Sequence, residues 1–281
     1  MAYTTLISAS DLAQHAFQAD WVVLDCRHDL AQPDAGRAAY DAGHIPNAQF
    51  ASLDQDLADH ARAADGRFRG RHPLPDIDVF IETLRRWGVN DNSQVVAYDA
   101  QGGMFAARLW WMLRWAGHQA VAVLDGGLPA WTAHGMWLST EPVSRPRGTI
   151  QRREPLASTV SADDILAQPQ LMVLDARAPD RFRGENETLD PVGGHIPGAK
   201  NRFFKDNLQA DGRFKPAAQL REELGALVTA PSSAVMQCGS GVTACHNLLA
   251  LEVAGLPGAA LYPGSWSEWC ADPARPVAKG A

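Results

Sequence analysis

One cysteine of the chain stands in a context that could make it a nucleophile. Cys238 begins the segment CGSGVTA, between an apolar run at 234–237 and another at 244–254. These runs predict a buried strand and a helix, so Cys238 should lie in the tight turn that joins them. Backbone N–H groups converge on an anion at such a turn and favour a thiolate. The alternative is a cysteine that merely packs at a strand end.

The residues after this cysteine favour the nucleophile over the packed cysteine. Gly239 and Gly241 let the backbone curl without a Cβ clash. Ser240 and Thr243 add hydroxyl donors beside the sulfur. The loop therefore resembles an anion-binding cradle that contains its own thiol.

The sequence contains two copies of one domain, because several segments recur in the same order. The repeated segments are VVLDCR at 22–27 and MVLDAR at 172–177, GHIPNA at 43–48 and GHIPGA at 194–199, DGRF at 65–68 and 211–214, and VVAYD at 95–99 opposite AVMQC at 234–238. Trp131 and Trp269 close the two series. We expect a first domain at 1–140, a Pro- and Arg-rich linker at 141–158 and a second domain at 159–281.

Each copy alternates short apolar strands with helices. In the first copy, we expect strands at 21–25, 95–98 and 121–124, and helices at 10–17, 77–87 and 104–116, with Ser10 as the N-cap of the first helix. This alternation predicts an α/β fold in which a parallel sheet is covered by helices on both faces. Ligands of such sheets bind beyond the carboxyl ends of the strands, where Cys238 and its counterpart Asp99 both lie.

Composition excludes several classes of function. The chain has 281 residues, 46% of them apolar, and a formal net charge of −7, which argues against nucleic-acid binding and against an anionic membrane surface. It shows no apolar run long enough to cross a bilayer and no export signal. Its four cysteines lack metal-ligand spacing and suit a reducing cytoplasm. No nucleotide or flavin motif is present, so we expect no metal and no cofactor.

Together, the repeat, the paired GHIPxA segments, the exchange of Asp99 for cysteine and the CGSGVTA loop resemble the two-domain rhodanese superfamily of sulfurtransferases. The Gly-Ser after the cysteine is similar to the 3-mercaptopyruvate branch, whereas thiosulfate-using members carry Arg-Lys there. The resemblance implies an inactive first domain and a catalytic second one. It also implies that Cys238 takes sulfur from a small donor as a persulfide and releases pyruvate. The sulfur would pass to a thioredoxin-like protein, a small dithiol or cyanide.

The same resemblance implies residues that bind the donor. Arg181 matches the family arginine that grips the donor's carboxylate, although it could instead pair with Asp180. The mercaptopyruvate branch has a second arginine at the position of Asp190, and Arg183 is the nearest substitute in sequence. Four residues of the cysteine loop should contribute further contacts: Gly239, Gly241, Val242 and Thr243.

A proton relay is also implied by the mercaptopyruvate branch. Ser240 and His44 fit its serine and histidine, and Asp34 or Asp41 could supply the acid. However, His195 occupies the same motif in the second copy, so the histidine could simply brace a turn. Phe105 could form a wall of a donor pocket between the two copies or belong to the core.

Other functions remain as alternatives. Thiosulfate could be the sulfur donor, and a thiol redox sensor could use Cys245 as its resolving residue. A partner-binding module without activity would not need the cysteine. A cysteine phosphatase would need an arginine where the chain has Ala244.

Overall fold

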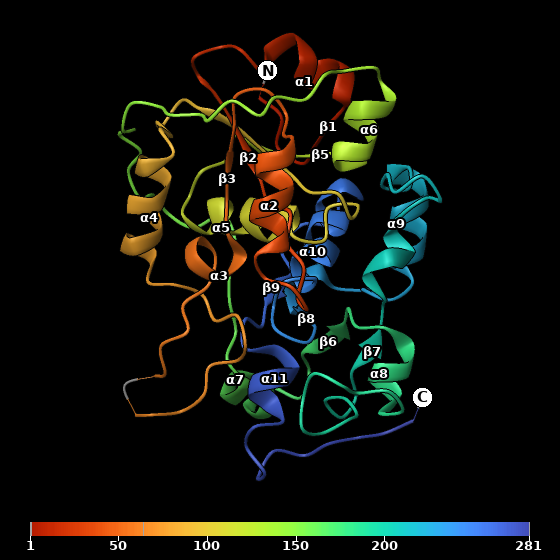
Figure 1. Ribbon diagram of the computed structural model, residues 1–281. Coiled ribbons are helices and arrows are strands. Elements are labelled where there is room, and N and C mark those ends of the chain that lie inside the picture. The colour runs from red at the N-terminus through yellow and green to blue at the C-terminus, as the bar shows by residue number, and fades with distance from the viewer. Residues whose placement is uncertain (1, 64, 281) are drawn as a thin grey trace. The chain divides into compact units, whose positions relative to one another are not determined.

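The computed structural model describes residues 2–63 and 65–280 and divides into two compact units (Figure 1). Unit 1 contains residues 1–59, 75–156 and 209–214, and unit 2 contains residues 60–74, 157–208 and 215–281. The units therefore differ from the contiguous ranges 1–140 and 159–281 in two exchanged segments. Residues 60–74 belong to unit 2, and residues 209–214 belong to unit 1. Among the described residues, no helix has the length and apolar character that crossing a membrane requires.

Unit 1 is built on a five-stranded parallel sheet. Its strands are β1 (Leu6–Ile7), β2 (Trp21–Asp25), β3 (Ala48–Phe50), β4 (Gln94–Tyr98) and β5 (Val121–Leu124), in the order β1-β5-β4-β2-β3. Its helices are α1 (Ala9–His15), α2 (Ala35–Ala42), α3 (Leu53–Asp56), α4 (Ile77–Arg86), α5 (Ala106–Trp115) and α6 (Gly127–Ala133). Every residue of the central strands β2 and β4 is buried, as expected for a sheet covered on both faces.

The two faces of this sheet bury different side chains. Residues that point to one face, including Val23, Val96 and Ala122, form a core with Leu12 of α1 and Trp131 of α6. Helix α5 packs against β4 and β5, and all but its last two residues are buried. The alternation of side chains along each strand thus supplies two cores.

Unit 2 repeats this plan with a four-stranded parallel sheet. The strands are β6 (Met172–Asp175), β7 (Lys200–Asn201), β8 (Ala234–Gln237) and β9 (Ala260–Leu261), in the order β7-β6-β8-β9. The helices are α7 (Ala162–Ala167), α8 (Pro179–Arg183), α9 (Ala217–Gly225), α10 (Ala244–Val253) and α11 (Ser265–Trp269), with 3-10 turns η1 (Phe204–Asn207) and η2 (Pro231–Ser233). A single bridge between Thr159 and Leu261 stands where unit 1 has β1.

The repeated Asp-x-Arg and Gly-His segments form one structural device in each unit. Nη2 of Arg27 binds both the Asp25 carboxylate, at 2.6 Å, and the carbonyl oxygen of Gly43, at 2.7 Å. In unit 2, Arg177 makes the same two bonds to Asp175 and Gly194, at 2.6 and 2.7 Å. Burial alone would lower the pKa of Arg177, but the charge of Asp175 raises it overall. These buried pairs fix the loop after β2 and β6, which explains why the segments recur.

The prediction of an α/β fold with two parallel sheets is confirmed, while some helix ends differ. Strands β2, β5 and β8 have the predicted bounds. The first helix begins earlier than predicted, because Ser8, and not Ser10, caps it by accepting a hydrogen bond from the backbone N–H of Asp11 at 3.1 Å. Residues of the predicted linker pack on unit 1, where the N–H of Arg153 binds the carbonyl oxygen of Ala116.

The segment 60–74 packs into unit 2 although it belongs to the first copy by sequence. In Figure 1 it is the orange loop beside α7 and α11. Arg67 forms an ion pair with Asp163 of α7, and the N–H of Arg71 donates to Oγ of Ser267 in α11 at 3.1 Å. Gly70 permits this approach: its φ is +95°, and a Cβ there would lie 2.7 Å from the carbonyl oxygen of Gly264. Unit 2 thereby gains side chains that its own repeat does not encode.

Candidate active site

Cys238 lies directly after β8, in a loop that curls around its sulfur. The residue is 2% exposed. Its Sγ accepts hydrogen bonds from the backbone N–H of Gly241 at 3.2 Å and of Ser240 at 3.5 Å. Gly241 has φ of +78°, and a Cβ there would lie 2.4 Å from the carbonyl oxygen of Pro263, so only glycine fits. The predicted cradle of backbone donors is therefore present at the thiol.

Helix α11 holds this loop from the other side. The N–H of Cys238 donates to Oγ of Ser265 at 3.1 Å. The carbonyl oxygens of Cys238 and Gly239 accept from the N–H groups of Trp266 and Ser267, each at 2.9 Å. The loop is thus fixed before any ligand arrives, which is the preorganisation that electrostatic catalysis needs.

The other three cysteines are buried, and none of the four forms a disulfide. Burial raises the pKa of Cys26, and the nearby Asp25 raises it further. Burial also raises the pKa of Cys270. Sγ of Cys245 in α10 donates to the carbonyl oxygen of Gly241 at 3.3 Å and so contacts the backbone of the loop. Among the four, Cys238 is the one whose sulfur accepts hydrogen bonds from the backbone of this loop.

Ser240 contacts a histidine that our sequence analysis did not identify. Nδ1 of His72 lies 2.8 Å from Oγ of Ser240. His72 is 7% exposed and comes from the segment 60–74, next to the anchored Arg71. The sequence around it has no helix or strand period, so only its residue type could have suggested a role.

Two arginines flank the loop at Gly239. A Cβ on Gly239 would lie 2.7 Å from Nη2 of Arg71 and 3.6 Å from Nη2 of Arg181. Glu187 binds Arg181 in a fork, through Nε at 3.1 Å and Nη2 at 2.8 Å. Asp190 forms an ion pair with Arg71 and lies 3.5 Å from Nη2 of Arg181. Arg181, which we predicted to bind the donor, therefore has a second arginine beside it.

Comparison with known proteins places the chain in a family. The rhodanese-like domain family matches it twice, over residues 8–134 and 158–272. The chain belongs to the rhodanese family. A probable 3-mercaptopyruvate sulfurtransferase of Pseudomonas aeruginosa is 47% identical to it over 286 residues, which cover 100% of both chains. A putative thiosulfate sulfurtransferase of Mycobacterium tuberculosis is 42% identical over 289 residues, covering 98% of this chain and 97% of the relative.

A solved relative agrees with the fold. The structure of a 3-mercaptopyruvate sulfurtransferase from Leishmania major has a TM-score of 0.84 and 33% sequence identity to this rhodanese, covering 95% of this chain and 74% of that one. The protein is thus a two-domain rhodanese and an enzyme, a sulfurtransferase, as the sequence indicated. The names of these relatives contain two different sulfur donors, 3-mercaptopyruvate and thiosulfate.

Unit 1 of this rhodanese has no thiol at the equivalent loop. Asp99 is fully buried there, and its carboxylate accepts from the N–H groups of Gln101, Gly103, Phe105 and Ala106 at 2.8 to 3.0 Å. The ring of Phe105 packs edge to face on His28, with ring centres 5.2 Å apart. A role for Phe105 in a donor pocket stays a prediction.

His44 occupies a turn of unit 1 and has backbone partners. Its Nδ1 lies 2.9 Å from the carbonyl oxygen of Tyr40, its Nε2 lies 3.1 Å from that of Glu141, and its ring stacks on Tyr40 at 4.0 Å. His195 repeats this arrangement in unit 2, with Nδ1 2.9 Å from the carbonyl oxygen of Phe182 and a stack at 3.8 Å. This parallel favours the bracing interpretation of the motif.

The remaining predicted residues range from exposed to buried. Arg183 forms a two-pronged ion pair with Glu185, at 2.8 and 2.7 Å, so it engages an acid of its own loop. Asp41 pairs with Arg37 in the same way, and Asp34 is exposed before α2. In the cysteine loop, Val242 is 4% exposed. Thr243 stands at the N-cap position of α10, but its side chain makes no capping hydrogen bond.

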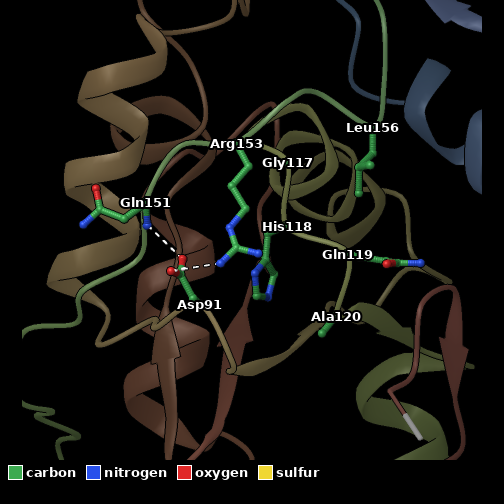
Figure 2. A pocket seen from close by; sticks show the side chains of 8 residues that line it. All are labelled: Asp91, Gly117, His118, Gln119, Ala120, Gln151, Arg153 and Leu156. Carbon is green, nitrogen blue, oxygen red and sulfur yellow. Dashed lines mark hydrogen bonds and ion pairs between the residues drawn. The ribbon is translucent and has the colours of Figure 1, made fainter.

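A separate cavity in unit 1 has different chemistry. It measures about 260 Å³ and is lined by Asp91, Gly117, His118, Gln119, Ala120, Gln151, Arg153 and Leu156 (Figure 2). Arg153 and the N–H of Gln151 both bind the Asp91 carboxylate, at 3.1 and 3.0 Å. The lining contains no cysteine, serine or threonine, so it offers no counterpart to Cys238. Within residues 2–63 and 65–280, no three His, Cys, Asp or Glu side chains are grouped to hold a metal ion.

Proposed function

We propose that this sulfurtransferase uses 3-mercaptopyruvate as its donor and Cys238 as its nucleophile. The observation that carries the proposal is the loop itself, in which two backbone N–H groups point at the sulfur and the hydroxyl of Ser240 lies 2.8 Å from Nδ1 of His72. Neutral hydrogen-bond donors of this kind stabilise a thiolate, and then a persulfide anion, without adding a positive charge to the loop.

In the proposed reaction, the Cys238 thiolate attacks the sulfur of the donor. A sulfur–sulfur bond forms and the carbon–sulfur bond breaks, and its electron pair goes to the carbon as the enolate of pyruvate. The enolate then takes one proton, and Ser240, hydrogen-bonded to His72, is placed to deliver it. An acceptor thiolate next attacks the outer sulfur of the persulfide, which regenerates the Cys238 thiolate. The acceptor is a small dithiol or a thioredoxin-like protein.

This assignment replaces His44 with His72 as the histidine partner of Ser240. His72 lies within hydrogen-bond distance of the serine, whereas both ring nitrogens of His44 face backbone carbonyls of unit 1. No acid is assigned to the relay.

Thiosulfate is the second candidate donor, and one observation favours it. Arg71 and Arg181 both approach Gly239 and could hold a compact dianion. Their buried partners Asp190 and Glu187 each carry a carboxylate, however, so the four side chains together have a formal charge of zero. A single carboxylate on the donor suits this balance better than two negative charges do.

A comparison of kcat/KM for 3-mercaptopyruvate and thiosulfate, with a dithiol acceptor, tests the proposal. We expect mercaptopyruvate to win by roughly 10²–10⁴-fold, the effect of two absent loop cations at about 1.5–3 kcal/mol each. Ser240→Lys should move the preference toward thiosulfate. Mass spectrometry of the donor-treated enzyme should show one added sulfur atom on Cys238. Equal or better use of thiosulfate by the wild type would reject this donor.

A further inference from the structure

The two arginines near Gly239 differ from their acid partners in exposure. The side chains of Arg71 and Arg181 are 26% and 20% exposed, whereas those of Asp190 and Glu187 are each 3% exposed. The guanidinium groups therefore reach toward the loop and the solvent, and the carboxylates lie behind them. A ligand that arrives at the cysteine loop meets two cations first.

Arg71 presents a particular nitrogen to the loop. Asp190 binds its Nη1, while Nη2 is the atom 2.7 Å from the Cβ position of Gly239. Its backbone is anchored to Ser267, and the next residue is His72, which contacts Ser240. A guanidinium that binds one carboxylate through Nη1 has further N–H donors for a second carboxylate.

Asp190 is a shared carboxylate between the two arginines. Burial raises its pKa, and the hydrogen bond from Arg71 opposes that rise. Burial also acts on Glu187, but there the hydrogen bonds from Arg181 and from the backbone lower the pKa overall. Removing Arg71 would leave the buried Asp190 poorly compensated, because Arg181 lies 3.5 Å from it. Glu187, in contrast, also pairs with Arg177 at 3.3 Å.

We propose that Arg71 is a specificity-determining residue that binds the anionic group of the sulfur donor together with Arg181, and that Asp190 is a positioning residue that holds Arg71 there. In this chain the second arginine thus comes from the segment 60–74, and an acid stands at position 190, where the mercaptopyruvate branch has its arginine. The arginine thus stands in a different segment, 119 residues earlier in the sequence than Asp190. The inference rests on the proposed function for the nature of the donor.

The first test is the kinetics of Arg71→Met. Because a lost charge-assisted hydrogen bond affects the bound donor, we expect KM for 3-mercaptopyruvate to rise about 10–100-fold while kcat changes less. Arg71→Lys keeps the charge but loses the forked guanidinium, so its KM should lie between those of the wild type and Arg71→Met. Arg67→Met, in the same segment but paired with the exposed Asp65, is the control and should keep the wild-type KM. An unchanged KM in Arg71→Met, or a loss confined to kcat, would overturn the inference.

Exchanging the two charges is the sharper test. Arg71→Asp alone places two acids together and should raise KM more than Arg71→Met does. The double variant Arg71→Asp with Asp190→Arg restores one ion pair and one arginine, so it should recover at least about 10-fold of that loss. If the double variant is no better than Arg71→Asp, position 190 does not hold Arg71 for the donor. Thermal unfolding of each variant checks that the fold persists.

Equilibrium binding separates this inference from the donor assignment. Calorimetry of pyruvate with the unreacted enzyme measures carboxylate binding without turnover, and Arg71→Met should weaken it by the same factor as KM. A wild type that prefers thiosulfate would reject the proposed donor alone, and Arg71 would then be judged by the KM for thiosulfate. Failure of the wild type to bind pyruvate, with mercaptopyruvate as its donor, would reject the role of Arg71.

Discussion

The loops after β4 and β8 occupy the same place in the two units, and each of them surrounds an anion or a group that can become one. In unit 1, the Asp99 carboxylate accepts four backbone N–H groups. In unit 2, Sγ of Cys238 accepts two. The cradle is therefore a property of the fold, and the side chain that fills it decides whether the loop is structural or reactive.

The supports of the two loops differ in a related way. Gly127, the first residue of α6, packs against the Asp99 loop. Its φ is +57°, and a Cβ there would lie 2.3 Å from the carbonyl oxygen of Asp99. The matching residue in unit 2 is Ser265, which adopts φ of +53° although it is not glycine. Its hydroxyl accepts from the N–H of Cys238 and donates to the carbonyl oxygen of Tyr262 at 2.9 Å. Unit 2 accepts backbone strain to gain a hydrogen bond at its cysteine.

The largest effect should come from replacing the thiol. Cys238→Ser should reduce sulfur transfer to background and abolish the added sulfur mass, because a hydroxyl forms no anion near neutral pH. Circular dichroism should show the wild-type fold. Cys26→Ala, Cys245→Ala and Cys270→Ala serve as controls and should keep most activity. Substantial turnover by Cys238→Ser would remove the chemical difference between the two loops.

Loss of the Ser240–His72 pair should have the next largest effect. We expect Ser240→Ala and His72→Asn each to lower kcat for 3-mercaptopyruvate about 10²-fold, the usual contribution of a positioned proton donor. The double variant should be little worse than either single one, because the two act together. His44→Asn is the contrasting variant and should mainly lower the melting temperature. A larger drop in kcat for His44→Asn than for His72→Asn would restore the relay predicted from the sequence.

In unit 1, the matching substitution should affect stability instead of chemistry. Asp99→Asn turns an amide NH2 toward the N–H groups of Phe105 and Ala106, so we expect the free energy of unfolding to fall by roughly 2–4 kcal/mol. Asp29→Asn is the control, because Asp29 also accepts backbone N–H groups but is exposed. Urea unfolding measures both variants. Equal stability of Asp99→Asn and the wild type would mean that the cradle does not need its carboxylate.

The smallest effect should follow changes at Ser265. Ser265→Gly relieves the positive φ but loses the hydroxyl, so stability should change by less than about 1 kcal/mol. Ser265→Ala keeps the strain and loses the same hydrogen bond, and it should be the less stable of the two. Both should lose a few-fold in kcat, because Cys238 loses one anchor. If Ser265→Ala matched the wild type in both measurements, the hydroxyl would have no role at the loop.

Some of this could be predicted from the sequence because the signals are local. Strand β8 and the loop after it follow from a buried apolar run, a cysteine and two glycines. The predicted N-cap of α1, Ser10, is wrong, because Ser8 and Ser10 both have the required side chain and only the backbone geometry decides between them.

The partners of the loop could not be predicted in the same way. His72 and Arg71 lie in an irregular segment, and their contacts with Ser240 and Asp190 depend on how that segment packs. Arg183 is close in sequence to Arg181, and it pairs with Glu185 at 2.7 Å, so a role in donor binding stays a prediction. A segment without hydrophobic periodicity has no sequence pattern from which its long-range packing could be predicted.

The exchanged segments also set the order in which the enzyme can be assembled during synthesis. Arg71 and the Ser267 that anchors it are 196 residues apart. At about 5–20 residues per second, the ribosome finishes the anchor roughly 10–40 s after the segment emerges. Unit 1 is also completed late in synthesis, because its segment 209–214 includes Phe214, whose N–H binds Asp125. A nascent chain therefore holds its arginine and histidine long before it has a cysteine loop to receive them, and a message truncated before that loop yields no partial catalyst.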